Sequence, residues 1–303
     1  MLTQKQHQIR KTGLGGSDIA AICGLSPWTT PLEVYLEKTG SKDPNDQPYT
    51  DAMYFGDVLE DIVANEYSKR TGYKVSIEPE TLRHPQYDFM LANIDRWAGN
   101  KDHILECKTT SGFNGDQWGH EGTDQIPNQY LTQVAWYAAI CNAPKVDIAV
   151  LIGGNQFKIY TYTRNYELEG KLINAAHNFW YNHVLAEKPP KCSNDSDVSY
   201  MYANDNGDLI QADDNIYNKY HELIELKDKK KDIEDKIKSL TIEIQEFMGQ
   251  CSKLTNPQGE TLATWNSVKP RKTFDSKALQ GQHPDLYEKF LKETKTSRRF
   301  TLK

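Results

Sequence analysis

The chain has 303 residues, of which 38% are hydrophobic and 26% charged, and its formal net charge is −6. This length is enough for one large domain or two ordinary ones with a full hydrophobic core. The acidic balance argues against a protein coated in basic surface for nucleic acid, but an acidic body can still bind DNA if its carboxylates cluster on metal ions and its basic side chains line one groove.

Two further classes of protein are excluded by what the sequence lacks. No run of eighteen apolar residues is present and residues 1–11 have no apolar core, so we expect neither a membrane span nor a secretory signal. The five cysteines are scattered without a C-x-x-C pair, which fits reduced cytoplasmic thiols and fits neither a zinc site nor a four-cysteine iron–sulfur cluster.

The chain begins with a glycine-rich turn that leads into an apolar stretch, residues 19–23. Ser17 or Asp18 would cap a short helix that Gly24 ends, and a second helix is expected from Pro31 to Lys38. Taken alone, the glycines favour an ordinary capped helix. Arg10 just upstream makes a phosphate pocket at the helix start the rival interpretation.

Residues 54–67 have the pattern of an amphipathic helix, with Val58, Ile62 and Val63 on its apolar face. Glu60 falls outside that face, so its carboxylate either is surface charge or points into a cleft. Short strands are expected at residues 75–77 and 81–84.

A hairpin is predicted next, with one strand from Met90 to Asp95, a polar turn at residues 98–102 and a second strand from Ile104 to Thr109. Side chains alternate between the faces of a strand, so Glu106 and Lys108 project to one side, and the hairpin brings Asp95 beside them.

This arrangement suits the chemistry of phosphodiesters. Two converging carboxylates hold a hard divalent cation such as Mg²⁺, and a lysine beside the ion can orient water or neutralise charge on a phosphoryl group. The spacing D-x₁₀-E-x-K is weak evidence by itself, because an edge strand often carries E-x-K as a solvated face.

Residues 110–127 are glycine-rich and polar, with Trp118 in their middle, and we expect a mobile loop near the site. The amphipathic helix predicted at residues 128–143 carries Gln133 and Tyr137 on one face, where they are either functional or a plain buried pair. The elements expected after it are strands at 146–151 and 156–162, a long helix at 166–186, and Pro189-Pro190 closing the domain.

The remaining third of the chain divides into a linker at residues 191–212, a long helix or coiled coil at 213–250, and a small hairpin and helix module at 251–303. In the helix, apolar residues repeat every seven positions, which is typical of a coiled coil or of a long helix packed on its own domain. Residues 269–272 are basic, and they either contact DNA or a partner or serve solubility. The two repeating sets are Ile216, Leu223, Lys230, Ile237 and Ile244, and Leu226, Ile233, Leu240 and Phe247.

Five short motifs in order resemble those of the YqaJ-like viral recombinase family, relatives of the phage lambda exonuclease. The resemblance covers residues 8–190 and implies an α/β fold with a restriction-endonuclease-like PD-(D/E)xK core, a mixed sheet flanked by helices. One departure is Ile94 before Asp95, where the family usually has proline. The motifs are Arg10 with Gly-Gly-Ser17-Asp18, Gly56-x-x-x-Glu60, Asn93-Ile-Asp95, Glu106-Cys-Lys108-Thr-Thr, and Gln133-x-x-x-Tyr137.

The resemblance also implies roles for single residues. Asp95 and Glu106, with the backbone carbonyl of Cys107, would bind Mg²⁺ (or Mn²⁺ in its place), and Glu60 would hold a second ion or its waters. Lys108 would position or help to deprotonate the attacking water. Gln133 and Tyr137 would brace the metal site and contact DNA. Arg10 and Ser17 would hold the 5′-phosphate of the DNA.

The implied function is a Mg²⁺-dependent 5′→3′ exonuclease on linear duplex DNA, which leaves 3′ overhangs for a phage single-strand annealing protein. By the same resemblance the protein would be of phage or prophage origin and would act in the cytoplasm of a bacterial host cell, without association with a membrane. It would form a homo-oligomer, a ring-shaped trimer. Two alternatives stay open: a DNA endonuclease of the same fold, and a non-catalytic DNA-binding scaffold for recombination.

Overall fold

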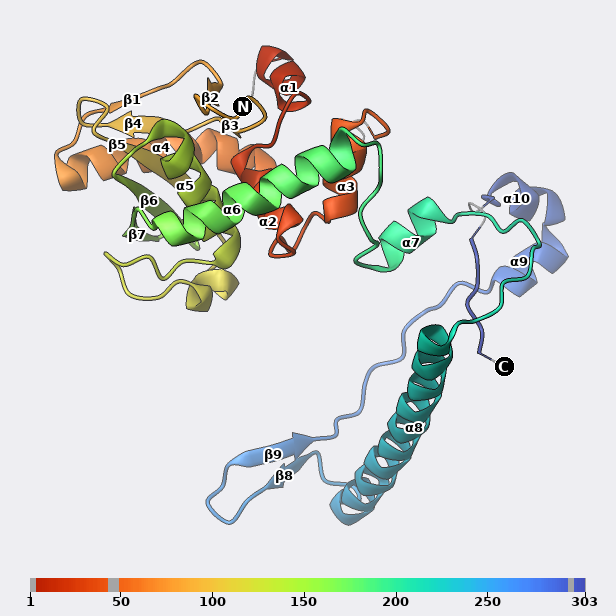
Figure 1. Ribbon diagram of the computed structural model, residues 1–303. Helices are drawn as coiled ribbons and strands as arrows, with labels where there is room; N and C mark the ends of the chain where they lie inside the picture. Colours follow the sequence, from red (N-terminus) through yellow and green to blue (C-terminus); the bar gives the residue numbers. More distant parts are fainter. Residues whose placement is uncertain (1–3, 43–48, 294–296, 303) are drawn as a thin grey trace. The chain divides into compact units, whose positions relative to one another are not determined.

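The structure is a computed structural model that describes residues 4–42, 49–293 and 297–302 (Figure 1). The chain divides into two compact units, Met1–Met201 and Tyr202–Lys303, which we describe separately. Within the described residues, no helix has the length and apolar character needed to cross a membrane.

A five-stranded mixed sheet is the centre of the first unit. Its strand order is β1-β4-β5-β6-β7, in which β5 and β6 are parallel and every other neighbouring pair is antiparallel. A separate two-stranded sheet pairs β2 with β3. The strands are β1 (Val75–Ser76), β2 (Leu82–Arg83), β3 (Leu91–Ala92), β4 (Arg96–Ala98), β5 (His103–Thr110), β6 (Lys145–Ile152) and β7 (Gln156–Thr163).

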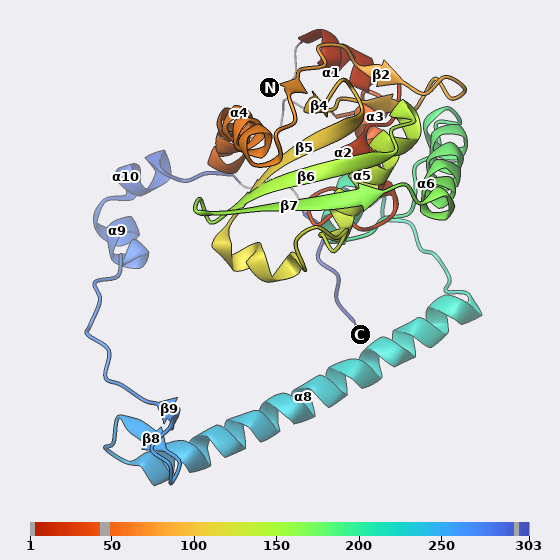
Figure 2. The ribbon, with the colours of Figure 1, turned by 90° about the vertical axis from the view of Figure 1, so that its left-hand side faces the viewer.

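Helices cover both faces of the main sheet (Figure 2). Helix α4 (Asp51–Thr71) packs on one face, where Tyr67 meets Leu105, and α5 (Asn128–Cys141) packs on the other, where Val134 meets Ile104. The other helices of this unit are α1 (Gln4–Arg10), α2 (Gly16–Ile22), α3 (Pro31–Lys38), α6 (Tyr166–Phe179) and α7 (Asp195–Met201). This layering confirms the predicted fold class of a mixed sheet flanked by helices.

A hairpin with β5 is present, but its first strand is β4, Arg96–Ala98, which begins just after the predicted strand, whereas β3, within the predicted range, pairs with β2 in the separate sheet. The register pairs Arg96 with Leu105, so Cys107 would lie opposite Ile94. Instead, the Cys107 N–H donates to the Asp95 carboxylate at 2.7 Å. The carboxylate takes the place of a backbone acceptor, so the chain leaves the main sheet at this point, and the prediction of a strand ending at Asp95 is wrong.

Helix α4 buries only part of the apolar face predicted for it. Val63 is buried as expected, together with Ala64 and Tyr67, whereas Val58 and Ile62 are 47% and 56% exposed. The buried apolar side chains all lie in the C-terminal half of the helix. The predicted inward orientation of Val58 and Ile62 is therefore wrong.

The short helix α2 also begins differently. Its N-cap is Gly15, and Asp18 accepts a hydrogen bond from the Gly15 N–H at 2.8 Å. The prediction of Ser17 or Asp18 as the N-cap is wrong by two to three positions. The Asp18 carboxylate lies in the first turn of the helix and accepts the hydrogen bond of the N-cap residue's own N–H.

Two segments expected without regular structure contain some. The loop at residues 110–127 holds a 3₁₀ segment, Gly112–Gln117, and its Trp118 is buried beside Tyr160. The expected linker contains α7, whose Asp197 is buried and accepts hydrogen bonds from the Thr30 hydroxyl and the Ser193 N–H. The loop at 110–127 and helix α7 are thus fixed to the first unit.

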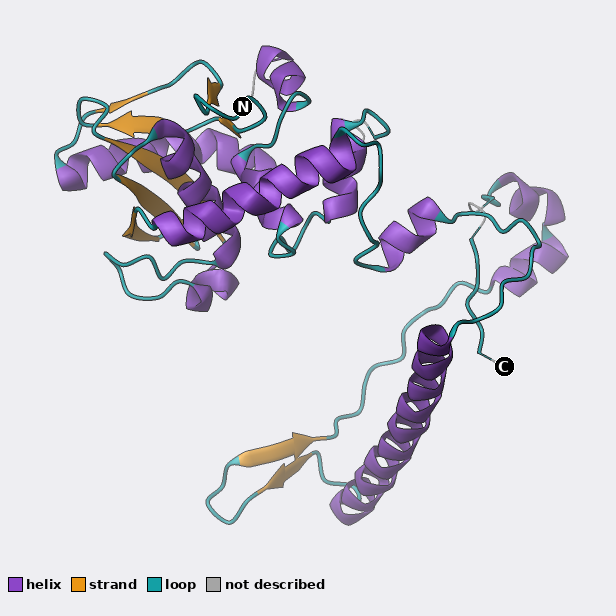
Figure 3. Ribbon diagram, viewed as in Figure 1, coloured by secondary structure: helices purple, strands orange, loops and turns teal. Residues whose placement is uncertain are grey.

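The second unit consists of a long helix, a hairpin and two short helices (Figure 3). The long helix falls within residues 213–250, and the module at residues 251–303 contains a hairpin and helices, as predicted. Residues 297–302 have no regular structure. The elements are α8 (Asp214–Met248), β8 (Lys253–Thr255), β9 (Thr261–Thr264), α9 (Ser276–Gln282) and α10 (Pro284–Lys289).

Candidate active site

The site is built on the central strand β5, where Glu106 and Lys108 share the α5 face of the sheet. The Lys108 Nζ donates to Glu106 Oε1 at 2.5 Å. Asp95 lies beside them because its carboxylate is bonded to the intervening Cys107 N–H. The structure therefore brings together Asp95, Glu106 and Lys108, which lie eleven and two residues apart in the sequence.

The electrostatics of this group are those of crowded carboxylates. Burial, followed by the neighbouring Glu106 carboxylate, raises the pKa of Asp95 well above its ordinary range. Burial also raises the pKa of Glu106, against the lowering effect of Lys108. For Lys108, burial favours the neutral amine, but Glu106 and Asp95 outweigh it and raise the pKa, so the side chain stays an ammonium.

Helix α5 holds Glu106 from the other side. The Gln133 Nε2 donates to Glu106 Oε1 at 2.9 Å and lies 3.0 Å from the Tyr137 hydroxyl. Glu106 is 1% exposed, and its second oxygen, Oε2, is buried without a hydrogen-bond partner among the described residues. A buried carboxylate oxygen left without a donor is costly, and a cation would relieve that cost.

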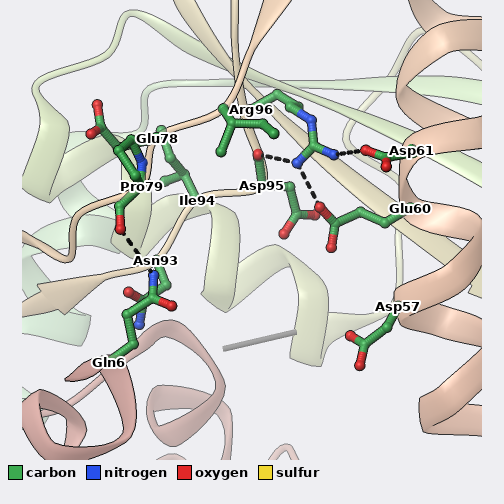
Figure 4. Close-up of a pocket in the computed structure, with 11 residues that line it drawn as sticks. Gln6, Asp57, Glu60, Asp61, Glu78, Pro79, Asn93, Ile94, Asp95 and Arg96 are labelled. Carbon is green, nitrogen blue, oxygen red and sulfur yellow. Dashed lines mark hydrogen bonds and ion pairs between the residues drawn. The ribbon is translucent and has the colours of Figure 1, made fainter. Parts of the chain in front are cut away.

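Glu60 reaches the site from α4 through Arg96. The Arg96 guanidinium, which is buried, bonds the Glu60 carboxylate and the Asp95 carbonyl, each at 2.5 Å, and also bonds Asp61. These groups line a cavity of about 510 Å³ together with Asp57, and Figure 4 shows Asp95, Glu60 and Arg96 next to one another on its wall. Of the two interpretations of Glu60, the structure supports the one in which it points into a cleft.

Arg10 and Ser17 are neighbours at the edge of the same region. The Arg10 Nη2 lies 3.4 Å from the Ser17 hydroxyl, and the buried Asp18 carboxylate lies 3.7 Å from the guanidinium and 2.8 Å from Lys38 Nζ. Ser17 itself is exposed. Asp18 therefore holds Arg10 in place while leaving most of the guanidinium's donors to a ligand.

Helix α2 connects this pair to Gln133 and Tyr137. A Cβ on Gly16 would stand 2.7 Å from the Tyr137 ring and 2.8 Å from Gln133 Cγ, so only glycine lets α2 approach α5 this closely. The two predicted motifs thus meet, with Arg10 and Ser17 on one side and Gln133, Glu106 and Lys108 on the other.

A second, aromatic cavity of about 220 Å³ lies next to Lys108. Tyr130 forms one wall, stacks on the buried Trp118 and has the Lys108 Nζ 5.1 Å from its ring centroid. Trp28 forms another wall and is 67% exposed. An exposed tryptophan beside an active-site lysine is suited to stack on a planar ligand.

The residues fit a magnesium site in which the protein supplies only a few of the ligands. In the described part of the chain, no three His, Cys, Asp or Glu side chains already converge as ligands. Mg²⁺ is usually bound by one or two protein carboxylates together with waters and substrate phosphates. Asp95 and Glu106 supply two carboxylates, and the Glu106 Oε2 atom is available as a metal ligand. Glu60, bonded to Arg96, is suited to a supporting role.

Sequence reasoning missed Arg96, the aromatic cavity and the Asp18–Lys38 pair. Arg96 had a signal, since a guanidinium inside an apolar strand needs carboxylate partners and the expected α4 helix offers Glu60 and Asp61. The aromatic residues had none, because the walls come from three separate parts of the chain.

The chain is similar to known proteins over most of its length. The YqaJ-like viral recombinase domain family matches residues 5–144. The uncharacterised protein YqaJ of Bacillus subtilis strain 168 is 37% identical over 309 residues, which cover 97% of this chain and 92% of that protein. The chain belongs to the YqaJ-like viral recombinase family.

Membership of the family confirms the resemblance read from the five motifs, and the match to YqaJ extends through both units. Among solved structures, an alkaline exonuclease from Laribacter hongkongensis superimposes with a TM-score of 0.50 at 16% identity, over 61% of this chain and 94% of that one. A phage-related exonuclease from Haemophilus somnus 129PT gives a TM-score of 0.45 at 12% identity, over 58% and 96%. The likeness to the alkaline exonuclease confirms the PD-(D/E)xK fold.

Proposed function

We propose that this family member is a magnesium-dependent exonuclease that degrades one strand of linear duplex DNA from its 5′ end. The observation that carries the proposal is the pair Asp95 and Glu106 beside the protonated Lys108, with a buried Glu106 oxygen that receives no hydrogen bond from the part of the chain that the structure describes. The viral recombinase family and the exonuclease of like fold support the same class of reaction.

Asp95, Glu106 and the Cys107 carbonyl would hold the ion, and Mn²⁺ could replace Mg²⁺. When bound, the ion supplies Lewis acidity toward a phosphate oxygen and lowers the pKa of a water. The chain's own contribution is positional: Gln133 orients Glu106, and Arg96 holds Glu60 at the cavity wall.

Lys108 would offset the negative charge that grows on the phosphoryl oxygens and would orient the attacking water. Its ammonium suits both tasks, because the carboxylates around it keep its pKa raised.

The DNA end would be held by groups on either side of the carboxylates. Arg10 and Ser17 would bind the 5′-phosphate with a guanidinium and a hydroxyl, and Trp28 would stack on a base beside Lys108. Cleavage from the 5′ end leaves a 3′ single strand, the substrate of a phage single-strand annealing protein.

The test uses linear duplex DNA with 5′-phosphate or 5′-hydroxyl ends and closed circular plasmid, each with Mg²⁺. Wild type is compared with Lys108→Ala, with Arg10→Ala and with the control Lys171→Ala, an exposed position on α6. We expect wild type and control to degrade only linear DNA and to prefer the 5′-phosphate, Lys108→Ala to be inactive, and Arg10→Ala to lose the preference.

Other results would change the assignment. Cutting of the closed circle by wild type would make the protein an endonuclease of the same fold. Binding of DNA without any metal-dependent cleavage by wild type would make it a scaffold.

A further inference from the structure

Helix α4 carries one stripe of residues from the main sheet to the candidate site. Intervals of three or four residues place the members of this stripe on one face of the helix: Gly56, Glu60, Val63 and Tyr67. Val63 and Tyr67 are buried against the sheet, and Glu60 lines the cavity of the candidate site (Figure 4). Gly56 lies one turn before Glu60, in the part of α4 that precedes its buried side chains.

The packing of the first unit gives no reason for a glycine at position 56. A Cβ added there would have no atom of residues 4–42, 49–293 or 297–302 within 4 Å, whereas a Cβ on Gly16 would collide with Tyr137. Gly56 lies inside a 21-residue α-helix and is not among the described glycines with a positive φ. Glycine is far less favourable than alanine in such a position. Gly56 therefore costs helix stability that none of its described contacts offsets.

The neighbours of Gly56 belong to the candidate site. Asp57, the next residue, and Glu60, one turn further on, both line the cavity of about 510 Å³. A glycine on the face of a helix lets a ligand come into contact with the helix backbone. The turn without a side chain is therefore next to the cavity that the DNA end enters in the proposed function.

We propose that the DNA strand entering this cavity packs against the backbone of α4 at Gly56 through its nucleoside part, sugar and base. The inference rests on the proposed function and adds a contact surface for its substrate. A phosphate is disfavoured at this surface, because Asp57 and Glu60 repel it and because N–H groups inside a helix already donate to the helix itself. Met53, three residues earlier on the same face, is 53% exposed and continues the surface with an apolar side chain.

Substitutions that add a side chain separate this role from a structural one. Gly56→Ala and Gly56→Leu keep a residue that favours the helix and fill the space in two steps. The matched controls are Gly170→Ala and Gly170→Leu. Gly170 lies inside α6, is partly exposed like Gly56, and likewise has no described atom within 4 Å of an added Cβ.

Every variant is made in full-length Lys108→Ala, which should bind DNA in Mg²⁺ without cleaving it. The measurements are the urea midpoint of unfolding and, by fluorescence anisotropy, the affinity for a 5′-phosphorylated linear duplex. We expect both alanine variants to raise the midpoint, because alanine favours the helix and restricts the unfolded chain. Affinity should fall about 5-fold in Gly56→Ala and at least about 50-fold in Gly56→Leu, since the added side chain enters space that the nucleoside fills. Both Gly170 variants should keep the affinity of Lys108→Ala.

Two results would overturn the proposal. Equal affinities of Lys108→Ala and both Gly56 variants would mean that DNA does not contact this turn of α4. A lower urea midpoint for Gly56→Ala would mean that the glycine serves the fold.

Failure of the proposed function gives a different result. A wild type that binds the duplex without cleaving it would refute the nuclease, while the affinities of the Gly56 variants would still decide whether DNA contacts α4 there. A protein that binds no DNA would overturn both.

Discussion

The two carboxylate oxygens of Glu106 have different surroundings, and this difference explains much of the site. Oε1 accepts from Lys108 and from Gln133, while Oε2 is buried and no residue within 4–42, 49–293 or 297–302 donates to it. The donors fix the direction in which the carboxylate points, and the second oxygen is left for a ligand. Gln133 therefore acts as a positioning residue for Glu106.

Gln133→Ala removes one of these donors while the other stays. We expect cleavage to fall by about 10–100-fold and the Mg²⁺ concentration for half-maximal activity to rise, because groups that orient metal ligands contribute on that scale. Activity is measured against Mg²⁺ concentration, with Asn174→Ala, an exposed amide on α6, as the control. An unchanged Mg²⁺ dependence would remove Gln133 from the support of the metal site.

Trp28 is a second residue whose role can be isolated, because its exposure makes it dispensable for the core. If it stacks on a base, Trp28→Ala should weaken DNA binding by about 1–3 kcal/mol, or about 5- to 150-fold, and change kcat less. Trp28→Phe keeps an aromatic face and should retain most of the affinity. Binding is measured with single-stranded and duplex DNA by fluorescence anisotropy; equal affinities of the alanine variant and wild type would contradict stacking.

At the scale of elements, α4 is fastened to the sheet by a buried polar cluster. The Asp147 carboxylate on β6 accepts from the Tyr67 hydroxyl of α4 at 2.6 Å and from the Thr161 hydroxyl of β7 at 2.8 Å. It also pairs with His103 of β5 and Lys145 of β6, each at 3.0 Å. Tyr67 lies seven residues, about two turns, after Glu60, so the cluster fixes the helix that carries Glu60 to the cavity.

Asp147→Asn should destabilise the fold in a pH-dependent way. Burial raises the pKa of Asp147, but the hydrogen bonds from His103, Tyr67, Lys145 and Thr161 outweigh it, so the folded pKa lies below the unfolded value. A lowered carboxylate pKa contributes stability above the unfolded pKa of about 3.9, and this stability is lost as the pH falls toward the folded value.

We therefore expect Asp147→Asn to cost roughly 2–4 kcal/mol at neutral pH, with the difference from wild type shrinking below about pH 4. Urea denaturation at several pH values measures it. Asp116→Asn, at an exposed carboxylate, should change the free energy of unfolding by less than about 0.5 kcal/mol. A pH-independent difference would show that Asp147 does not stabilise the fold through its charge.

The elements also show what sequence could predict. Strand β5 and its alternation followed from residues close in the chain, so Asp95, Glu106 and Lys108 were found together. The inner face of α4 was mispredicted, because Val58 and Ile62 continue the helical apolar pattern beyond the end of the sheet that would bury them. The walls of the aromatic cavity and the contact of Gly16 with Tyr137 depend on how distant segments pack in the tertiary structure. The periodicity of the sequence does not predict such packing.

At the scale of the whole molecule, every residue of the candidate site lies in the first unit, whose boundary falls after Met201. Helix α7 belongs to that unit because Asp197 accepts from Thr30, the N-cap of α3, and Met201 packs against the main core. A truncation after Met201 therefore keeps the whole candidate site.

A fragment of residues 1–201 should fold and cleave DNA, whereas a fragment of residues 1–190 should be less stable by roughly 2–4 kcal/mol. The shorter fragment lacks Asp197, Met201 and the partly buried Cys192, so it loses hydrogen bonds to a charged group and apolar contacts. Urea denaturation of both fragments and their cleavage of linear DNA measure this. Equal stabilities would mean that α7 contributes nothing to the first unit, and loss of cleavage by the longer fragment would show that the second unit is needed for catalysis.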